Sequence, residues 1–263
     1  MITLDTMREP SLEGKKYDIR VRPFQASDLS TVREMFLASM VNQSDSPFAK
    51  AMKGQLTAPL SWASYAAFVV GLIVRRWCSK RIGVSLSLLG SIIFAVHRTV
   101  LYIGLRRRVE RNLKADLADI AGHYGMKEVA DRNTGAVRYT PSGKSGFWIA
   151  EVGSEGKEPE AIGCVGLDAN TNADPTSAEL RRMSVVSSYR RKGVALLLVR
   201  ALMEHSRENG IKTVFFSTSS FQEGAMKMYQ RYGWKYQGKE DVSFWSQKIY
   251  WHNFSIQVDD FSL

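Results

Sequence analysis

The sequence predicts an α+β fold of mixed α/β type, with a central mixed sheet, helices packed against it and an inserted apolar helical hairpin. Two observations predict this. Short segments of strand type alternate with amphipathic helical segments through the second half of the chain. Two long apolar stretches, each flanked by basic residues, separate that half from a first strand and helix. A chain of 263 residues is long enough to bury a substantial core.

The N-terminal part begins with polar residues 1–16, which we expect to be flexible. An alternating strand follows from Tyr17, and a helix that Ser27 or Asp28 can cap extends to about Met40. Residues 17–41 are therefore predicted to be the first strand and helix of the domain that contains the mixed sheet.

The positive charge of the chain is confined to one segment. The formal net charge is +10, and residues 50–111 contain eleven Lys and Arg side chains against a single acid, Glu110. This segment therefore carries the whole excess, and the rest of the chain is formally neutral. Because these cations flank the most apolar stretches, they indicate anionic lipid as a partner and do not indicate nucleic acid.

The apolar stretches within residues 50–111 predict a membrane hairpin that contacts lipid through residues 56–108. Residues 56–74 carry no charge, residues 82–96 are apolar again, and a basic turn joins them. A spanning helix needs about 20 apolar residues, so the second stretch is short. We expect a hairpin embedded from one face. One alternative is a pair of helices that both span the membrane, and another is a pair of core helices in a soluble domain. Cys78, in the basic turn, is a candidate for palmitoylation.

The remaining elements follow from periodicity and turn residues. An amphipathic helix is expected over residues 106–124 and a loop over residues 131–146. The strands are predicted at residues 147–152, 161–167, 179–186, 212–217, 234–237 and 244–254, and the helices at residues 195–208 and 222–232.

A basic turn between one strand and the following helix is the clearest site signal. Arg190, Arg191 and Lys192 directly precede Gly193, where the helix begins. The free N–H groups and the positive end of the helix dipole suit a phosphate group, and glycine allows close backbone approach. The alternative is a solvated basic corner without a ligand.

The pattern Arg-x-x-Gly-x-Ala, formed by Arg190, Gly193 and Ala195, resembles the acetyl-CoA signature of the GNAT acetyltransferase superfamily. A second GNAT-like pattern, Asn-x-x-Ala-x-x-x-Tyr-x-x-x-Gly-Phe, has Tyr229 in place and Gln222 where the family has asparagine. The basic-flanked hairpin and the strand Glu-Leu-x-Arg-Met-Ser-Val are similar to membrane-bound acetyltransferases of the camello type, which include cysteine-conjugate and aspartate N-acetyltransferases. The resemblance implies the GNAT acyl-CoA N-acyltransferase fold, with residues 106–257 as the core that holds the acetyl-CoA site.

The resemblance also implies roles for individual residues. The pantetheine arm pairs with the backbone of Met183, Ser184 and Val185, and the pyrophosphate lies on the amides of the turn and the first helical residues. The predicted cofactor-binding residues are therefore Met183, Ser184, Val185, Arg190, Arg191, Lys192, Gly193, Val194, Ala195 and Gln222. Tyr229 is the candidate acid that protonates the coenzyme thiolate. The alternative is that Tyr229 is only a packed tyrosine of the core. Glu179 is the candidate general base, against a strand-end carboxylate paired with Arg181.

The expected function is a membrane-associated, acetyl-CoA-dependent N-acetyltransferase, an acyltransferase of groups other than amino-acyl groups, acting on a small amine by direct attack. Protein lysine acetylation and a catalytically inactive, membrane-bound binding module are the alternatives. Two cysteines and four scattered histidines lack zinc-ligand spacing, so no metal site is expected, and we expect no signal peptide. The resemblance implies the endoplasmic reticulum membrane with a cytosolic catalytic domain. The sequence indicates neither the acceptor amine nor the oligomeric state.

Overall fold

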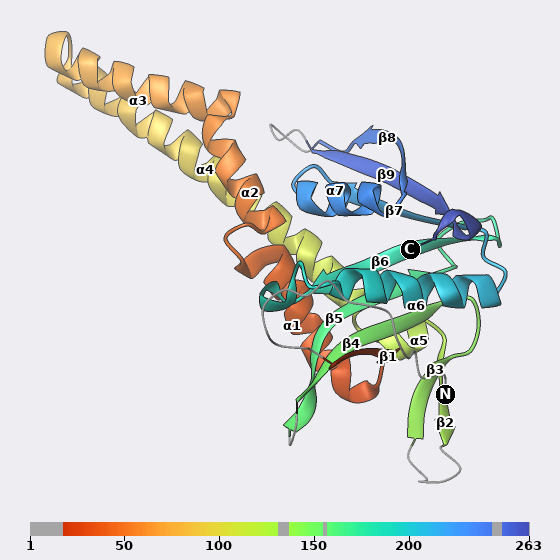
Figure 1. Cartoon of the computed structure of the whole chain (residues 1–263). Helices are drawn as coiled ribbons and strands as arrows, with labels where there is room; N and C mark the ends of the chain where they lie inside the picture. The colour runs from red at the N-terminus through yellow and green to blue at the C-terminus, as the bar shows by residue number, and fades with distance from the viewer. Residues whose placement is uncertain (1–17, 131–136, 155–156, 244–248, 263) are drawn as a thin grey trace.

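The computed structural model describes residues 18–130, 137–154, 157–243 and 249–262. Its main sheet has seven strands in the order β1-β4-β5-β6-β7-β9-β8, and β2 and β3 form a separate hairpin (Figure 1). All neighbouring strands of the sheet are antiparallel except β6 and β7. The predicted mixed sheet is therefore confirmed. The strands are β1 Asp18–Pro23, β2 Met126–Ala130, β3 Val137–Pro141, β4 Gly146–Ser154, β5 Lys157–Asp168, β6 Ser177–Val185, β7 Thr213–Ser219, β8 Lys235–Asp241 and β9 Tyr250–Gln257.

Helices cover both faces of the sheet. The helices are α1 Leu29–Leu37, α2 Pro47–Gly54, α3 Pro59–Trp77, α4 Lys80–Lys114, α5 Ile120–His123, α6 Val194–Glu208 and α7 Glu223–Arg231. One apolar cluster lies between the sheet and α6 and α7, with Leu198 and Leu202 fully buried. A second cluster lies on the opposite face under α1 and α5, with Phe147 and Leu117 at its centre. The sheet therefore has a core on each face, which is the layered arrangement that the alternating segments predict.

The parallel strands β6 and β7 pair only at their beginnings. Residues 177–179 of β6 pair with residues 213–215 of β7, and the ladder ends there. On its other side, β6 remains paired with β5 as far as Val185. Beyond Glu179, β6 therefore presents a row of backbone groups toward β7 without a ladder partner. We call this opening between the two strands the strand split.

A β-bulge at Arg182 changes the direction of the side chains in β6. Arg182 has φ +56°, and the β5–β6 register shifts between Cys164 and Gly166. A bulge inserts one extra residue, so the alternation of side chains between the two faces shifts by one position. Arg181 and Arg182 consequently both contact groups on the α5 face, while Met183 and Val185 pack with the cluster under α6.

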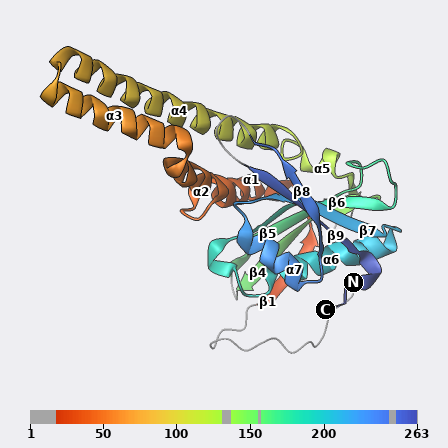
Figure 2. The same ribbon diagram turned by 90° about the horizontal axis from the view of Figure 1, so that it is seen from above.

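Helices α3 and α4 form a hairpin that extends away from the sheet (Figures 1 and 2). The prediction of a short second apolar stretch and a separate helix over residues 106–124 is wrong, because α4 is one helix of 35 residues. At 1.5 Å per residue it is about 52 Å long. His97 and Arg98 interrupt the apolar stretch in the sequence but not in the structure. His97 is buried, and Arg98 donates a hydrogen bond to the carbonyl oxygen of Met52 in α2.

Small residues form the contact between the two hairpin helices. A Cβ atom built on Gly71 would lie 2.3 Å from Ser87 Oγ, and one on Gly83 would lie 2.2 Å from the backbone nitrogen of Arg75. Large apolar side chains instead face outward, and Trp62 and Trp77 are 61% and 78% exposed. A soluble helix pair buries its large apolar residues, whereas close contact through small residues is common between membrane helices. Helix α4 is long and apolar enough to span a membrane, and 17% of its most apolar window is buried.

Two further expectations differ from the structure or lie outside it. The predicted loop over residues 131–146 is only partly a loop, because Val137–Pro141 is a strand that pairs with Met126–Ala130. Residues 1–17, 131–136 and 244–248 are outside the described residues, and with them lie the predicted flexible N-terminus and the beginning of the last predicted strand.

Candidate active site

The loop from Arg190 to Gly193 has a backbone shaped for an anion. Gly193 is the N-cap of α6 with φ +81°, and Arg191 also has a positive φ of +61°. Such alternating conformations turn successive N–H groups toward a common point, and the first N–H groups of a helix have no partners within the helix. Lys192 belongs to this loop, and Val194 and Ala195 begin α6. A Cβ on Gly193 would meet nothing within 4 Å, so the backbone conformation and not space requires glycine there.

The side chain of Arg190 is bonded to the protein itself. Its Nε donates to the carbonyl oxygen of Val185 at 3.1 Å, and its Nη2 donates to Gln43 Oε1 at 2.8 Å. An ion pair of 3.6 Å joins it to Asp45. Arg190 therefore links the loop from Arg190 to Gly193, which we call the phosphate loop, to the segment between α1 and α2. Because its guanidinium is bonded to these protein groups, Arg190 has fewer N–H donors left for a phosphate than the sequence suggested.

Met183, Ser184 and Val185 border the strand split, as the sequence predicts for residues that pair with an extended ligand. Their backbone is held on the β5 side through the pairs Ser184–Cys164 and Val185–Gly163. The Ser184 hydroxyl donates to the carbonyl oxygen of Met35 at 3.4 Å, so this side chain points to the α1 face. The edge of β6 that has no ladder partner in β7 can therefore hydrogen-bond a polar chain lying in the split, beside the hydrogen bond that the Val185 carbonyl oxygen accepts from Arg190.

Helix α7 brings Tyr229 and Gln222 to the same side of the split. Tyr229 is 3% exposed, and its hydroxyl has no hydrogen-bond partner within the described residues. Burial raises the pKa of Tyr229 well above its ordinary value, which keeps the phenol protonated. Gln222 accepts a hydrogen bond of 2.6 Å from the Thr218 hydroxyl through Oε1. Its amide nitrogen is then the group that can donate to a ligand.

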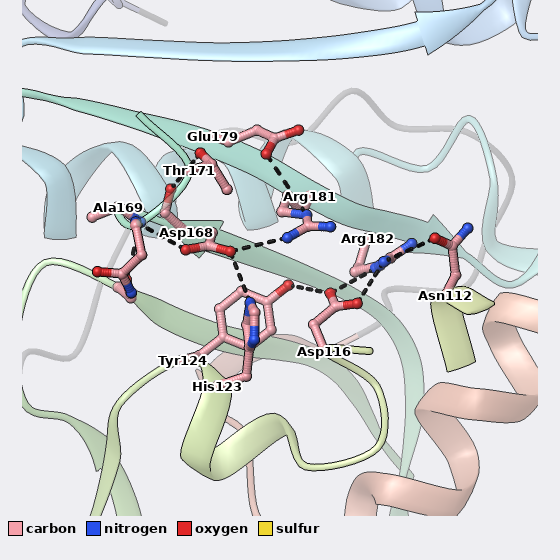
Figure 3. Close-up of polar contacts among 12 residues, drawn as sticks. Asn112, Asp116, His123, Tyr124, Asp168, Ala169, Thr171, Glu179, Arg181 and Arg182 are labelled. Carbon is pink, nitrogen blue, oxygen red and sulfur yellow. Dashed lines mark hydrogen bonds and ion pairs between the residues drawn. The ribbon is translucent and has the colours of Figure 1, made fainter. Parts of the chain in front are cut away.

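Glu179 lies on the opposite face of the sheet in a polar cluster with Asp168, Arg181 and His123 (Figure 3). Asp168 is the cross-strand partner of Glu179. It accepts hydrogen bonds from Arg181 Nη1 at 3.0 Å and interacts with His123 Nε2 at 2.8 Å. Arg181 Nε lies 3.8 Å from Glu179 Oε2, as expected of a paired strand-end carboxylate.

The two carboxylates of this cluster have pKa values shifted in opposite directions. Burial raises the pKa of Glu179, the charge of Asp168 raises it further, and Arg181 only partly opposes this. Burial acts on Asp168 in the same sense, but hydrogen bonds from the Asn170 amide, His123 and Arg181 outweigh it and lower the pKa of Asp168. Asp168 therefore stays ionised, while Glu179 is the carboxylate better suited to accept a proton.

A second polar cluster holds the bulge itself. Arg182 makes a bidentate pair with Asp116, with Nε–Oδ2 and Nη2–Oδ1 distances of 2.7 and 2.5 Å. The Tyr124 hydroxyl donates to Asp116 Oδ2 at 2.7 Å (Figure 3). The Arg182 guanidinium lies over the ring of Phe36. Asp116 is fully buried just after α4, so this pair fixes the base of the hairpin to β6.

Sequence reasoning missed Asp116, His123 and Asp168. The available signal was the pair Arg181–Arg182 within a buried strand, because buried arginines require carboxylate partners. Cys164 is buried, and burial raises the pKa of its thiol to about 12. Among the described residues, no group of three or more His, Cys, Asp or Glu side chains could hold a metal ion.

The comparisons with known proteins show which proteins this chain is similar to. The model of the acetyltransferase (GNAT) family matches residues 113–234, a range that includes Glu179, the phosphate loop and Tyr229. Human N-acetyltransferase 8B is 28% identical over 236 residues, which cover 88% of this chain and 91% of that protein. N-acetylaspartate synthetase of Xenopus tropicalis is 28% identical over 227 residues, 86% of this chain and 73% of that protein. The probable N-acetyltransferase camello of Xenopus tropicalis is 30% identical over 135 residues, 51% of this chain and 52% of that protein.

Proposed function

The chain is an N-acetyltransferase with a GNAT-family domain, and from that premise we propose that it is membrane-anchored and acetylates the amine of a small molecule or amino-acid derivative. The strand split carries this proposal. The loop from Arg190 to Gly193, our candidate for binding phosphate, lies at its open end, and the candidate acid and the candidate base lie on opposite faces near its closed end.

We assign acetyl-CoA to the α6–α7 side of the split. The N–H groups from Arg191 to Ala195 would bind its phosphates, and the backbone of Met183 to Val185 would pair with its pantetheine arm. The Gln222 amide nitrogen would donate to the same arm. Acetyl-CoA supplies an activated thioester, so the chain needs to provide only orientation, a base and an acid.

The acceptor amine would approach from the Glu179 face. Glu179 takes the proton from the amine, directly or through water, so that the neutral nitrogen can attack the thioester carbonyl. The C–N bond forms, the C–S bond breaks, and Tyr229 gives its proton to the departing thiolate. The acetylated nitrogen then gives up its second proton, which returns through water to the Tyr229 phenolate, so that the amide is neutral and Tyr229 is restored. Because burial raises the pKa of Tyr229, its phenol stays protonated and holds a proton that it can donate to the thiolate. Asp168, held ionised, raises the pKa of Glu179 and so favours its acceptance of a proton.

The substrate proposal is tested by free-CoA release from the full-length chain across an amine panel. Aspartate, cysteine conjugates, polyamines and a lysine-containing peptide represent the competing classes. Turnover with a small amine and none with the peptide supports the proposal. Turnover with the peptide alone would indicate protein lysine acetylation, and binding of acetyl-CoA without turnover would indicate an inactive binding module.

We further propose that the α3–α4 hairpin is inserted in a membrane, with the catalytic domain in the cytosol and the endoplasmic reticulum as the compartment. The 19 residues of α3 extend about 28 Å, close to the thickness of about 30 Å of a bilayer hydrocarbon core. Its exposed apolar side chains extend from Trp62 to Trp77, which favours insertion over the full length of α3 rather than the shallow embedding expected from the sequence. The resemblance to camello-type enzymes supports the compartment.

Protease protection of a tag placed between Cys78 and Ser79 tests the insertion. A tag protected in sealed vesicles, with the chain resisting alkaline extraction, supports full insertion. A tag cleaved from the cytosolic side would contradict it.

A further inference from the structure

The closed end of the strand split is bounded by one residue from each strand. The last pair of the β6–β7 ladder is Glu179–Phe215, so Leu180 and Phe216 are the first residues beyond it. Both side chains belong to the apolar cluster under α6 and α7, with exposures of 5% and 4%. They therefore form the floor of the split on the side where Tyr229 lies.

Aromatic contacts hold the ring of Phe216 in place. Its centroid lies 4.1 Å from that of Tyr229 and 5.0 Å from that of Trp234. The ring of Phe254 stacks on it at 5.1 Å with an interplanar angle of 8°. A side chain enclosed on several sides cannot move aside without disturbing its neighbours, because protein interiors are close-packed.

We propose that Phe216, with Leu180 opposite it, restricts the transferred acyl group to acetyl and excludes longer acyl chains. This inference rests on the proposed function, because it places an acyl-CoA thioester in the split. From Val185 to Glu179 the split is six residues deep, about 20 Å at 3.3 Å per strand residue. A pantetheine arm that enters at the phosphate loop brings its acyl group to the floor of the split. Each further methylene of the acyl chain must then displace the Phe216 ring or the Leu180 side chain.

The size of the effect follows from what a tight apolar pocket can discriminate. One additional methylene in such a pocket changes kcat/KM by about 10–200-fold. Phe216→Leu shortens the side chain that fills the floor, so the ratio of kcat/KM for propionyl-CoA to that for acetyl-CoA should rise at least about tenfold. Leu180→Ala removes the opposite wall and should raise the same ratio.

Phe254→Leu is the matched control. It makes the same substitution in the ring stacked on Phe216, but from β9, which lies beyond β7 from the split. It should lower the melting temperature as Phe216→Leu does and leave the acyl-chain ratio unchanged. This separates a change at the floor from a general loosening of the aromatic cluster.

The experiment uses the full-length chain in lipid vesicles with acetyl-, propionyl- and butyryl-CoA and a single acceptor amine. Calorimetric dissociation constants for the three acyl-CoA esters give the same ratio without any acceptor. Raised ratios in Phe216→Leu or Leu180→Ala, with an unchanged ratio in Phe254→Leu, support the assignment. Ratios within twofold of wild type in the variants that fold, or an equal rise in Phe254→Leu, would overturn it. A wild-type chain that binds the esters but transfers no acyl group would count against the proposed function, while the binding ratios would still decide the role of Phe216.

Discussion

Replacing Asp116 with asparagine should destabilise the protein and distort the active site together. The substitution removes the charge from a fully buried carboxylate and leaves the Arg182 guanidinium, whose side chain is 10% exposed, without its counter-ion. Breaking a buried pair by removing one partner costs about 3–5 kcal/mol. Because asparagine still accepts a hydrogen bond, we expect about 3 kcal/mol, the lower end of that range. For a protein of this size this corresponds to a fall of about 6–12 °C in melting temperature.

The depressed pKa of Asp116 also determines how the loss of stability in Asp116→Asn depends on pH. Burial alone would raise the pKa of Asp116, but the hydrogen bonds and charge of Arg182 outweigh it and hold the pKa below its usual value. A depressed carboxyl pKa stabilises the fold above the unfolded-state pKa, and that contribution is lost as the pH falls through the folded-state pKa. The difference between wild type and Asp116→Asn should therefore be constant from about pH 5 to 8 and shrink below about pH 4.

Melting of the detergent-solubilised full-length chain, followed by tryptophan fluorescence, measures the effect. Tyr124→Phe is the control, because it removes only the hydrogen bond to Asp116 and should cost about 1–2 kcal/mol. Asp116→Asn should also lower turnover, since the Arg182 bulge positions Arg181 beside Glu179. A melting temperature within about 1 °C of wild type, equivalent to less than about 0.5 kcal/mol, would refute this account of the ion pair.

Three further substitutions test individual roles at the site. Tyr229→Phe should lower turnover about 100-fold or more with little change in acetyl-CoA affinity. It should not lower the melting temperature, because the hydroxyl has no partner within the described residues; unchanged turnover would remove Tyr229 as the acid. The wild-type rate should fall as the pH drops through the raised pKa of Glu179, because a base must be deprotonated, and Glu179→Gln should abolish this limb; an unaltered pH–rate profile would exclude the base role. Gly193→Ala forces a Cβ into a left-handed conformation at about 1–2 kcal/mol without a clash, so the chain should fold but bind acetyl-CoA more weakly in calorimetry; an unchanged affinity would contradict the phosphate-loop assignment.

The parts of the site that are continuous in sequence were predictable. The phosphate loop needs only a strand, a glycine with positive φ and a helix start, and all lie between Val185 and Val194. Tyr229 was selected through the resemblance of residues 222–234 to a GNAT pattern, and its role as the acid stays a prediction. The bulge at Arg182 was not, because nothing in the local residue pattern distinguishes it from a regular strand position.

The long-range pairs could not be predicted in the same way. Asp116 and Arg182 are 66 residues apart, and neither residue is unusual for the segment in which it occurs. The continuity of α4 was missed because His97 and Arg98 look like an interruption when burial is unknown. The structure directs both residues toward the protein side of the hairpin, so the outer apolar surface continues past them.

Acetyl transfer itself is the most direct test of the proposed function. The full-length chain is incubated with radiolabelled acetyl-CoA and the amine panel, and free CoA and acetylated amine are quantified together. We predict equal amounts of both products with a small amine, and a loss of both in Tyr229→Phe. Acetyl-CoA that is bound without being consumed, or hydrolysed without any acetylated amine, would contradict the account.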